Sequence, residues 1–248
     1  MISQNEIHKE IVEMLNKLKM HHMASELEKI YLLPNFVGMN NLELLHSIVS
    51  KEYIHSTNAR YISRLKKAGL TGSSCLLEQC VDSKERSYLP SGIIDILSTL
   101  NFIEQGMNLC IFGASDSGKT YLARALGTNA CKDFRVGYFH CDNLVGNLAY
   151  FRKDDYKSYS KKINSLVKLD LVILDDFLLH PIANQDEIKA LYEVLEKRNV
   201  ASKSCIVCSQ RDPKSWPSML MQDEVESNSI LKRATKHYSV MIERKLND

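Results

Sequence analysis

The chain has 248 residues, 44% of them hydrophobic and 25% charged, enough for one large domain or for a medium and a small one. The formal net charge is only +2, so any DNA contact has to come from local basic patches. No apolar run approaches the roughly 18 residues of a membrane helix, which excludes a membrane-spanning helix. The polar start of the chain contains no secretory signal, and we expect a cytoplasmic protein with free cysteine thiols.

Residues 1–70 are expected to form a small helical domain that binds DNA or a partner protein. Apolar residues recur there at helical spacing in three sets: Ile7, Ile11, Met14, Leu15 and Leu18; Met23, Leu27 and Ile30; Leu42, Leu45, Ile48, Val49 and Tyr53. Residues 32–41 contain proline, glycine and asparagine, which predicts a turn between the last two sets.

Residues 71–90 are predicted to connect this domain to a second region, 91–248, in which strands and helices alternate. We expect strands at 109–112, 135–140, 169–174, 204–209 and 238–243; helices at 119–132, 143–152 and 186–199; an N-cap at Asp142; and a further helix opening at Asp212. Such alternation predicts an α/β fold, with a parallel sheet covered by helices on both faces. Only residues 244–248 follow the last expected strand, too few for a further C-terminal domain.

The sequence GASDSGKT, residues 113–120, matches the phosphate-binding pattern G-x-x-x-x-G-K-[ST] between an expected strand and an expected helix. In such a loop, backbone N–H groups and the helix N-terminus bind phosphate oxygens. Lys119 would reach the β- and γ-phosphates, and Thr120 would bind Mg²⁺. The expected ATP-binding residues are Gly113, Ala114, Ser115, Asp116, Ser117, Gly118, Lys119, Thr120 and Tyr121. The alternative is a glycine turn with a chance lysine.

Asp116 places a carboxylate inside this loop. Facing a polyphosphate, it would cost about 1 kcal/mol or more. Because the backbone supplies most phosphate contacts, we expect Asp116 to point outward, where solvent screens its charge.

A second acidic motif, Asp175 followed by Asp176, ends the apolar strand expected at 169–174. Asp175 is predicted to hold Mg²⁺ and Asp176 to act as the general base that activates water. An ordinary polar strand end is the alternative. Asp176 is one methylene shorter than glutamate, so we expect slow hydrolysis.

Two further residues are candidates for the catalytic step. Gln210, with Ser209 beside it, ends the strand expected at 204–209 and would sense the γ-phosphate. A polar strand cap explains Gln210 equally well. Arg233 precedes the last expected strand and would act on a neighbouring subunit as an arginine finger, or would be a solvated basic residue.

A basic segment, 151–168, carries six Lys or Arg against two acids, with tyrosines between them. Its predicted contacts to double-stranded DNA are Arg152, Lys153, Lys157, Lys161 and Lys162. Such phosphate contacts would be independent of sequence and sensitive to salt. A second candidate surface consists of Arg60, Arg64, Lys66 and Lys67. The alternative for both is a solvated helix face.

The order of GASDSGKT, VILDDF, CSQRDPKSW and SNSILKRATKHYSVMIE resembles that of the IstB-type transposition helper ATPases, relatives of the DnaC-type helicase loaders in the AAA+ group. The resemblance covers roughly residues 10–245 and implies a P-loop AAA+ core without a C-terminal lid. It implies ATP and Mg²⁺ as cofactors, an ATP-dependent homo-oligomer on double-stranded DNA, and delivery of target DNA to a partner transposase.

The residues that match the family motifs are Lys119 and Thr120 in Walker A, Asp175 and Asp176 in Walker B, Gln210 with Ser209 as the first sensor, and Arg233 as the arginine finger. Two positions depart from the family. Lys232 stands where Asp is common, and Leu178 stands where glycine usually follows the acidic pair. Both departures bear on the geometry between subunits more than on ATP binding.

Three alternatives remain open at this stage. A helicase loader would act on a replicative helicase. A small-molecule P-loop kinase would be indifferent to DNA. A binding module would hold ATP without hydrolysing it.

Overall fold

The computed structural model describes residues 3–34, 36–220 and 224–245, apart from the side chains of residues 37, 224 and 226. The chain divides into two compact units, Met1–Ser63 and Arg64–Asp248, which are described separately. Within the described ranges, no helix is long and apolar enough to cross a membrane.

The N-terminal unit contains helices α1 (Gln4–Lys17) and α2 (His21–Tyr31), the 3₁₀ turn η1 (Phe36–Gly38) and the start of α3 (Asn41–Ala68). A capping box begins α1: the Ser3 side chain accepts a hydrogen bond from the Glu6 N–H, and the Glu6 carboxylate accepts one from the Ser3 N–H. The small core consists of Val12, Leu15, Ala24, Leu27, Ile30 and Ile48.

The predicted apolar faces of this unit are only partly correct. Leu15, Leu27, Ile30 and Ile48 are buried as expected, and Val12 joins them. The exposed members of the predicted sets are Ile7, Ile11, Met14, Leu18, Leu42, Leu45, Val49 and Tyr53. Three short segments can cover only one narrow face of each helix, so flanking apolar positions stay in solvent.

The second unit is built on a six-stranded sheet in the order β1-β6-β2-β5-β4-β3. Its strands are β1 (Arg86–Leu89), β2 (Leu109–Phe112), β3 (Val136–His140), β4 (Leu171–Asp175), β5 (Ser204–Ser209) and β6 (Tyr238–Arg244). All pairs are parallel except β1 with β6. The five parallel strands are those predicted. Strand β1 was missed within the segment 71–90, because it is a short edge strand with only Tyr88 buried.

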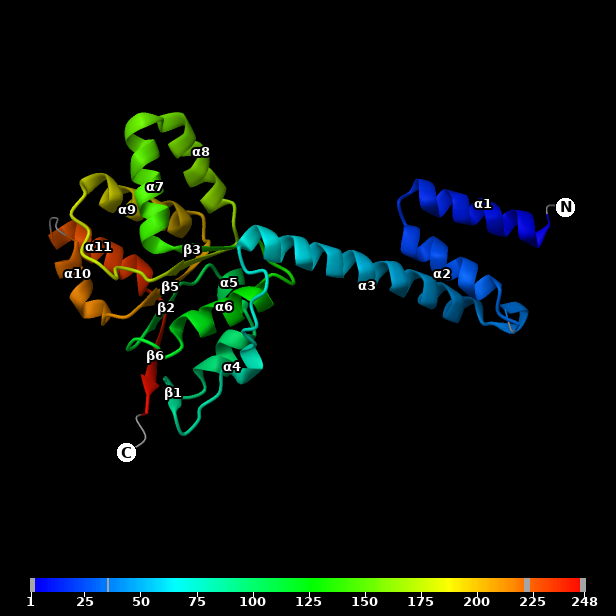
Figure 1. The fold of residues 1–248 in the computed structure, drawn as a ribbon, viewed down its shortest axis with the longest axis horizontal. Coiled ribbons are helices and arrows are strands. Elements are labelled where there is room, and N and C mark those ends of the chain that lie inside the picture. The colour runs from blue at the N-terminus through cyan, green and yellow to red at the C-terminus, as the bar shows by residue number, and fades with distance from the viewer. Residues whose placement is uncertain (1–2, 35, 221–223, 246–248) are drawn as a thin grey trace. The chain divides into compact units, whose positions relative to one another are not determined.

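Helices cover both faces of this sheet (Figure 1). Helix α6 (Lys119–Ala130) packs on one face, while α7 (Cys141–Asp154), α9 (Gln185–Val200) and α11 (Glu224–Ala234) cover the other, with α8 (Tyr156–Val167) against α7 and α9. Val172 and Leu174 belong to the core beneath α7 and α9. Ile173 points to the opposite face, where a Cβ on Gly127 of α6 would lie 2.6 Å from its Cδ1. Strand β4 is therefore buried on both sides.

The shorter elements are η2 (Leu77–Gln79), α4 (Ile93–Ser98), α5 (Asn101–Glu104), η3 (Pro213–Ser215) and α10 (Trp216–Met219). Two predicted helix starts need correction. Helix α7 begins at Cys141 with His140 as its N-cap, because β3 leads directly into the helix, and Asp142 lies in the first turn instead. Asp212 does act as an N-cap, accepting a hydrogen bond from the Lys214 N–H at 2.8 Å, but the element that it caps is the 3₁₀ turn η3.

All seven cysteines are free thiols, and six of them are buried. Burial raises the pKa of the Cys110 and Cys141 thiols to about 12, so these thiols stay protonated and unreactive at neutral pH.

Candidate nucleotide-binding site

The loop Gly113–Thr120 joins β2 to α6 and depends on its two glycines. Gly113 has φ +154°, and a Cβ there would lie 2.3 Å from the carbonyl oxygen of Ile242 on β6. Gly118 has φ +104° and is the N-cap of α6. Both backbone conformations favour glycine, and at Gly113 the close approach of β6 leaves no room for a side chain, so the glycines of the sequence pattern have a structural cause.

The loop encloses groups suited to an anionic ligand. The Ser117 hydroxyl is buried without a hydrogen-bond partner among the described residues. The first N–H groups of α6 have no partner within the helix, and the positive end of the helix dipole lies there. A phosphate group therefore fits the donors that the loop presents.

A cleft of about 290 Å³ opens beside the loop. The residues lining it are Ser115, Asp116, Gly118, Lys119, Thr120, Asp176 and Gln210. Strand β5 lies between β2 and β4, so the carboxyl ends of three strands meet here. The structure thus brings together loop residues, Asp176 after β4 and Gln210 after β5.

Lys119 is almost fully buried, with 7% of its surface exposed. Its Nζ donates a hydrogen bond to the Ala114 carbonyl oxygen at 2.5 Å. Burial lowers the pKa of Lys119, and the nearby carboxylates of Asp175 and Asp176 oppose that change. Within the described part of the chain Lys119 forms no ion pair, which leaves its charge free for an anionic ligand.

Asp175 stands at the centre of a hydrogen-bond network. Its Oδ1 accepts from the Thr120 hydroxyl at 3.1 Å and from the Asp176 N–H at 3.1 Å, and its Oδ2 accepts from the Tyr138 hydroxyl at 2.5 Å. Burial, followed by the bond to Asp175, raises the pKa of the Tyr138 hydroxyl. A hydroxyl and a carboxylate 3.1 Å apart are the oxygen ligands that Mg²⁺ prefers, so Thr120 and Asp175 fit a magnesium ion.

Asp176 follows in a left-handed conformation, with φ 54°. Its Oδ2 lies 3.7 Å from Nδ1 of His140, the last residue of β3. Gln210 lines the same cleft and is exposed. Sequence reasoning missed Tyr138 and His140, although they alternate at the end of an expected strand. Their relevance depends on β3 pairing with β4, and the sequence does not give that strand order.

Asp116 is exposed to solvent and also lines the cleft, with φ 58°. Its charge is close enough to raise the pKa of Lys119, although less than Asp175 and Asp176 do.

Two other residues near the site have structural contacts instead. Ser209 is fully buried and accepts a hydrogen bond from Nε1 of Trp216 at 3.3 Å, so it does not line the cleft with Gln210. The Tyr121 hydroxyl accepts from the Leu76 N–H at 3.1 Å and bonds the Gln79 side chain. Tyr121 thus fastens α6 to the segment before β1.

Arg233 on α11 is bound within its own chain. Its guanidinium pairs with Glu196 on α9 and bonds Ser229, and it lies 4.8 Å from the centroid of the Tyr192 ring. Arg233 does not line the cleft of its own chain.

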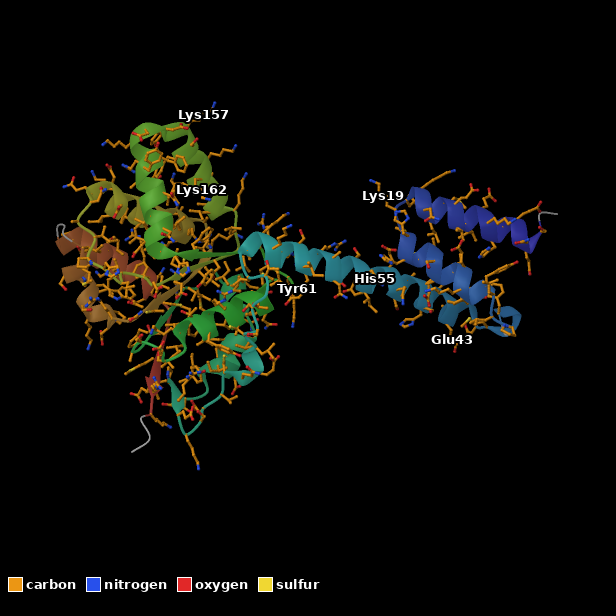
Figure 2. The ribbon with its side chains drawn as sticks, in the orientation of Figure 1. Lys19, Glu43, His55, Tyr61, Lys157 and Lys162 are labelled. Atoms are coloured by element: carbon orange, nitrogen blue, oxygen red, sulfur yellow. The ribbon has the colours of Figure 1, made fainter. Side chains whose placement is uncertain are left out.

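The predicted DNA-binding residues fall into two groups. Arg152 is neutralised by Asp186 at 3.5 Å and Glu193 at 3.2 Å, because α7 packs against α9. The other four are exposed: Lys153, Lys157, Lys161 and Lys162. Figure 2 shows Lys157 at the end of α8 far from the sheet and Lys162 farther along the same helix. In the second candidate surface, Arg64 bonds the carbonyl oxygens of Cys131 and Lys132, while Arg60, Lys66 and Lys67 are exposed.

The chain is similar to known proteins that are named for insertion sequences. Residues 13–246 match the family model described as IstB-like ATP binding protein. A Pseudomonas fluorescens protein named for insertion sequence IS1162 and for ATP binding is 29% identical, over 79% of this chain and 83% of the relative. A Pseudomonas aeruginosa protein named for insertion sequence IS21 and for ATP binding is 26% identical, over 94% of this chain and 85% of the relative.

Solved structures share the fold. AMPPCP-bound DnaA from Aquifex aeolicus aligns with a TM-score of 0.55 and 20% identity, over 69% of this chain and 51% of DnaA, about half its length. The DnaC helicase loader aligns with a TM-score of 0.52 and 17% identity, over 69% of this chain and 98% of DnaC. At such identities the likeness establishes the fold alone. The predicted class, a P-loop AAA+ core with a largely parallel sheet between helices and additional N-terminal helices, is confirmed.

Proposed function

Since this chain belongs to the IstB-like ATP-binding protein family, we propose that it binds ATP at the loop Gly113–Thr120, hydrolyses it, and assists a transposase in DNA transposition. The observation that carries the enzymatic part is the single cleft that joins Lys119, Thr120, Asp176 and Gln210. The insertion-sequence names of the relatives support the transposase as partner.

In this mechanism the loop N–H groups and Lys119 bind the phosphates. Thr120 and Asp175 would hold Mg²⁺, which would neutralise part of the charge on the phosphates. Tyr138 donates to Oδ2 of Asp175 and so fixes the orientation of that carboxylate. The network therefore preorganises the metal ligands through residues from β3, β4 and α6.

Asp176 acts as the general base toward the attacking water, and Gln210, which lines the same cleft, orients that water. His140, 3.7 Å from Oδ2 of Asp176, holds the carboxylate in place. The short aspartate side chain keeps turnover slow until DNA or the partner protein tightens the geometry.

We further propose that the chain forms an ATP-dependent homo-oligomer on double-stranded DNA and delivers target DNA to the transposase. Arg233 would act in trans on the nucleotide of a neighbouring subunit, exchanging Glu196 for a phosphate. Exposed lysines of α7 and α8 would contact DNA phosphates. The helical domain predicted at residues 1–70 would bind DNA or the partner.

A DnaC-type helicase loader is the alternative and has less support. The likeness to the DnaC helicase loader is confined to the fold, at 17% identity, whereas relatives at up to 30% identity are named for insertion sequences. A loader would bind a replicative helicase instead of a transposase.

Phosphate release from ATP, measured with and without duplex DNA, tests this function. Wild-type protein should release phosphate above background and faster with DNA, whereas Lys119→Ala should bind no ATP. Turnover equal to that of Lys119→Ala would contradict the ATPase proposal. Binding of the purified chain to a replicative helicase, with none to the transposase of the same insertion sequence, would favour the alternative.

A further inference from the structure

Arg86 reaches the phosphate-binding loop from the strand that the sequence did not predict. It is the first residue of β1 and lies opposite Arg244 in the antiparallel register with β6. Because β1 runs against the other strands, its first residue lies at their carboxyl edge. The loop Gly113–Thr120 leaves β2 at that same edge.

The Arg86 guanidinium lies directly against Gly118. A Cβ built on Gly118 would be 2.8 Å from Cζ and 2.9 Å from Nη1 of Arg86. The Nε atom of Arg86 is buried and has no hydrogen-bond partner among the described residues. In the same ranges no carboxylate forms an ion pair with Arg86.

Arg86 interacts with the neutral Tyr88 hydroxyl, but a guanidinium without a carboxylate partner in this position still favours an anion. The side chain is partly buried, and leaving its enclosed Nε without a partner is costly; the positive end of the α6 dipole adds to the unfavourable field. Lys119 begins the same helix and brings a further positive charge. A phosphate would interact favourably with the Arg86 guanidinium, the N-terminus of α6 and the Lys119 ammonium group. A guanidinium can bind two phosphate oxygens at once.

We propose that Arg86 is a further ligand of the nucleotide and contacts its diphosphate part, an inference that rests on the proposed ATP binding. The side from which Arg86 approaches the loop decides which phosphate its guanidinium contacts. Asp176 and Gln210 follow β4 and β5, on one side of β2, whereas Arg86 comes from β1, on the other. The γ-phosphate must lie near Asp176 and Gln210, so Arg86 meets phosphates that ADP also carries.

Isothermal titration of the full chain with ATP and with ADP tests the assignment. Arg86→Ala should weaken the affinity for both nucleotides by the same factor, roughly tenfold to a hundredfold, as expected for loss of a charged hydrogen bond. Arg244→Ala is the matched control, because it removes an equal charge from the exposed register partner. It should leave both affinities within about twofold of wild type.

Arg86→Gln and Arg86→Lys separate charge from packing, and melting temperatures without nucleotide show whether each variant is folded. Arg86→Lys should retain part of the nucleotide affinity that Arg86→Gln loses. Equal binding by Gln, Lys and wild type would overturn the proposal while Lys119→Ala still loses ATP, leaving the proposed function intact. A loss confined to ATP would overturn the diphosphate assignment. If the wild-type chain binds neither ATP nor ADP, that result would contradict the proposed function itself.

Discussion

Three non-glycine residues at or next to the candidate site have a left-handed backbone. Asp116, Asp176 and Leu178 have φ values of 58°, 54° and 51°. Such a conformation costs a non-glycine residue about 1 kcal/mol or more, and aspartate tolerates it better than leucine does. The surrounding structure must therefore hold these residues in place. Leu178 thus has a backbone conformation that glycine favours, at the position where the resemblance implies glycine.

At Asp116 we predict that substitution by glycine tightens ATP binding. Glycine removes the carboxylate beside the phosphates, and a gain of about 1 kcal/mol corresponds to roughly fivefold. Titration at low and high salt measures the effect. Asp116→Asn removes the charge alone, because asparagine also tolerates left-handed backbone. Unchanged affinity in both variants would mean that solvent screens the carboxylate.

At Leu178, burial of the side chain stabilises the fold, whereas the strain of its left-handed backbone destabilises it. Leu178 is fully buried, and its truncation should cost about 2–5 kcal/mol. Glycine recovers about 1 kcal/mol of strain that alanine keeps. Chemical denaturation should therefore find Leu178→Gly less stable than wild type yet more stable than Leu178→Ala. The reverse order of the two variants would show that the left-handed conformation is not strained.

At the level of the elements, the carboxylate of Asp170 connects the N-terminal ends of β3, β4 and β5. Asp170 accepts from the Arg135 N–H at 3.0 Å, from Arg135 Nε at 3.1 Å and from Lys203 Nζ at 2.7 Å. Burial by itself would raise the pKa of Asp170, but the bonds from Arg135 and Lys203 outweigh it and lower that pKa. The carboxylate therefore stabilises the folded sheet in its ionised form.

We predict that Asp170→Asn lowers the free energy of unfolding by about 1 kcal/mol at pH 7, since partial exposure weakens these ion pairs. The pKa is lower in the folded chain, so the contribution is complete above the unfolded value of about 4 and disappears as pH falls below it. Denaturation curves of both proteins should converge in acid. A constant difference down to low pH would exclude the ionised bridge.

Prediction from sequence succeeded where the pattern was local. The apolar runs ending at Phe112, Asp175 and Ser209 gave three core strands to within two residues. Strand β1 could not be found, because its only buried side chain, Tyr88, forms no pattern and pairing with β6 defines it. Tyr138 was missed for a similar reason, since its role depends on which strand lies beside β3.

On the scale of the whole molecule, the proposed DNA surface is a cluster of exposed lysines without carboxylate partners among the described residues. Lys157, Lys161 and Lys162 lie on α8, where Lys162 Nζ is 5.9 Å from the centroid of the Phe139 ring. Arg152 is already paired with Asp186 and Glu193. We therefore assign Arg152 to the packing of α7 on α9.

Replacing Lys157, Lys161 and Lys162 together by alanine should weaken duplex DNA binding. The slope of log K against log salt should fall by up to about 3, close to one unit for each lost phosphate contact. Fluorescence anisotropy over a salt series measures both quantities. The matched control replaces Arg60, Lys66 and Lys67. If the control alone loses affinity, DNA binds the second candidate surface.

We propose that this chain hydrolyses ATP with Asp176 as the base, and the variant Asp176→Asn tests that role directly. Asparagine keeps the shape and tolerates φ 54°, but it cannot accept a proton. Single-turnover hydrolysis and ATP binding should be measured on the same preparation. We predict wild-type affinity with hydrolysis slowed about a hundredfold or more. Hydrolysis by Asp176→Asn at the wild-type rate would contradict the assignment of Asp176 as the general base.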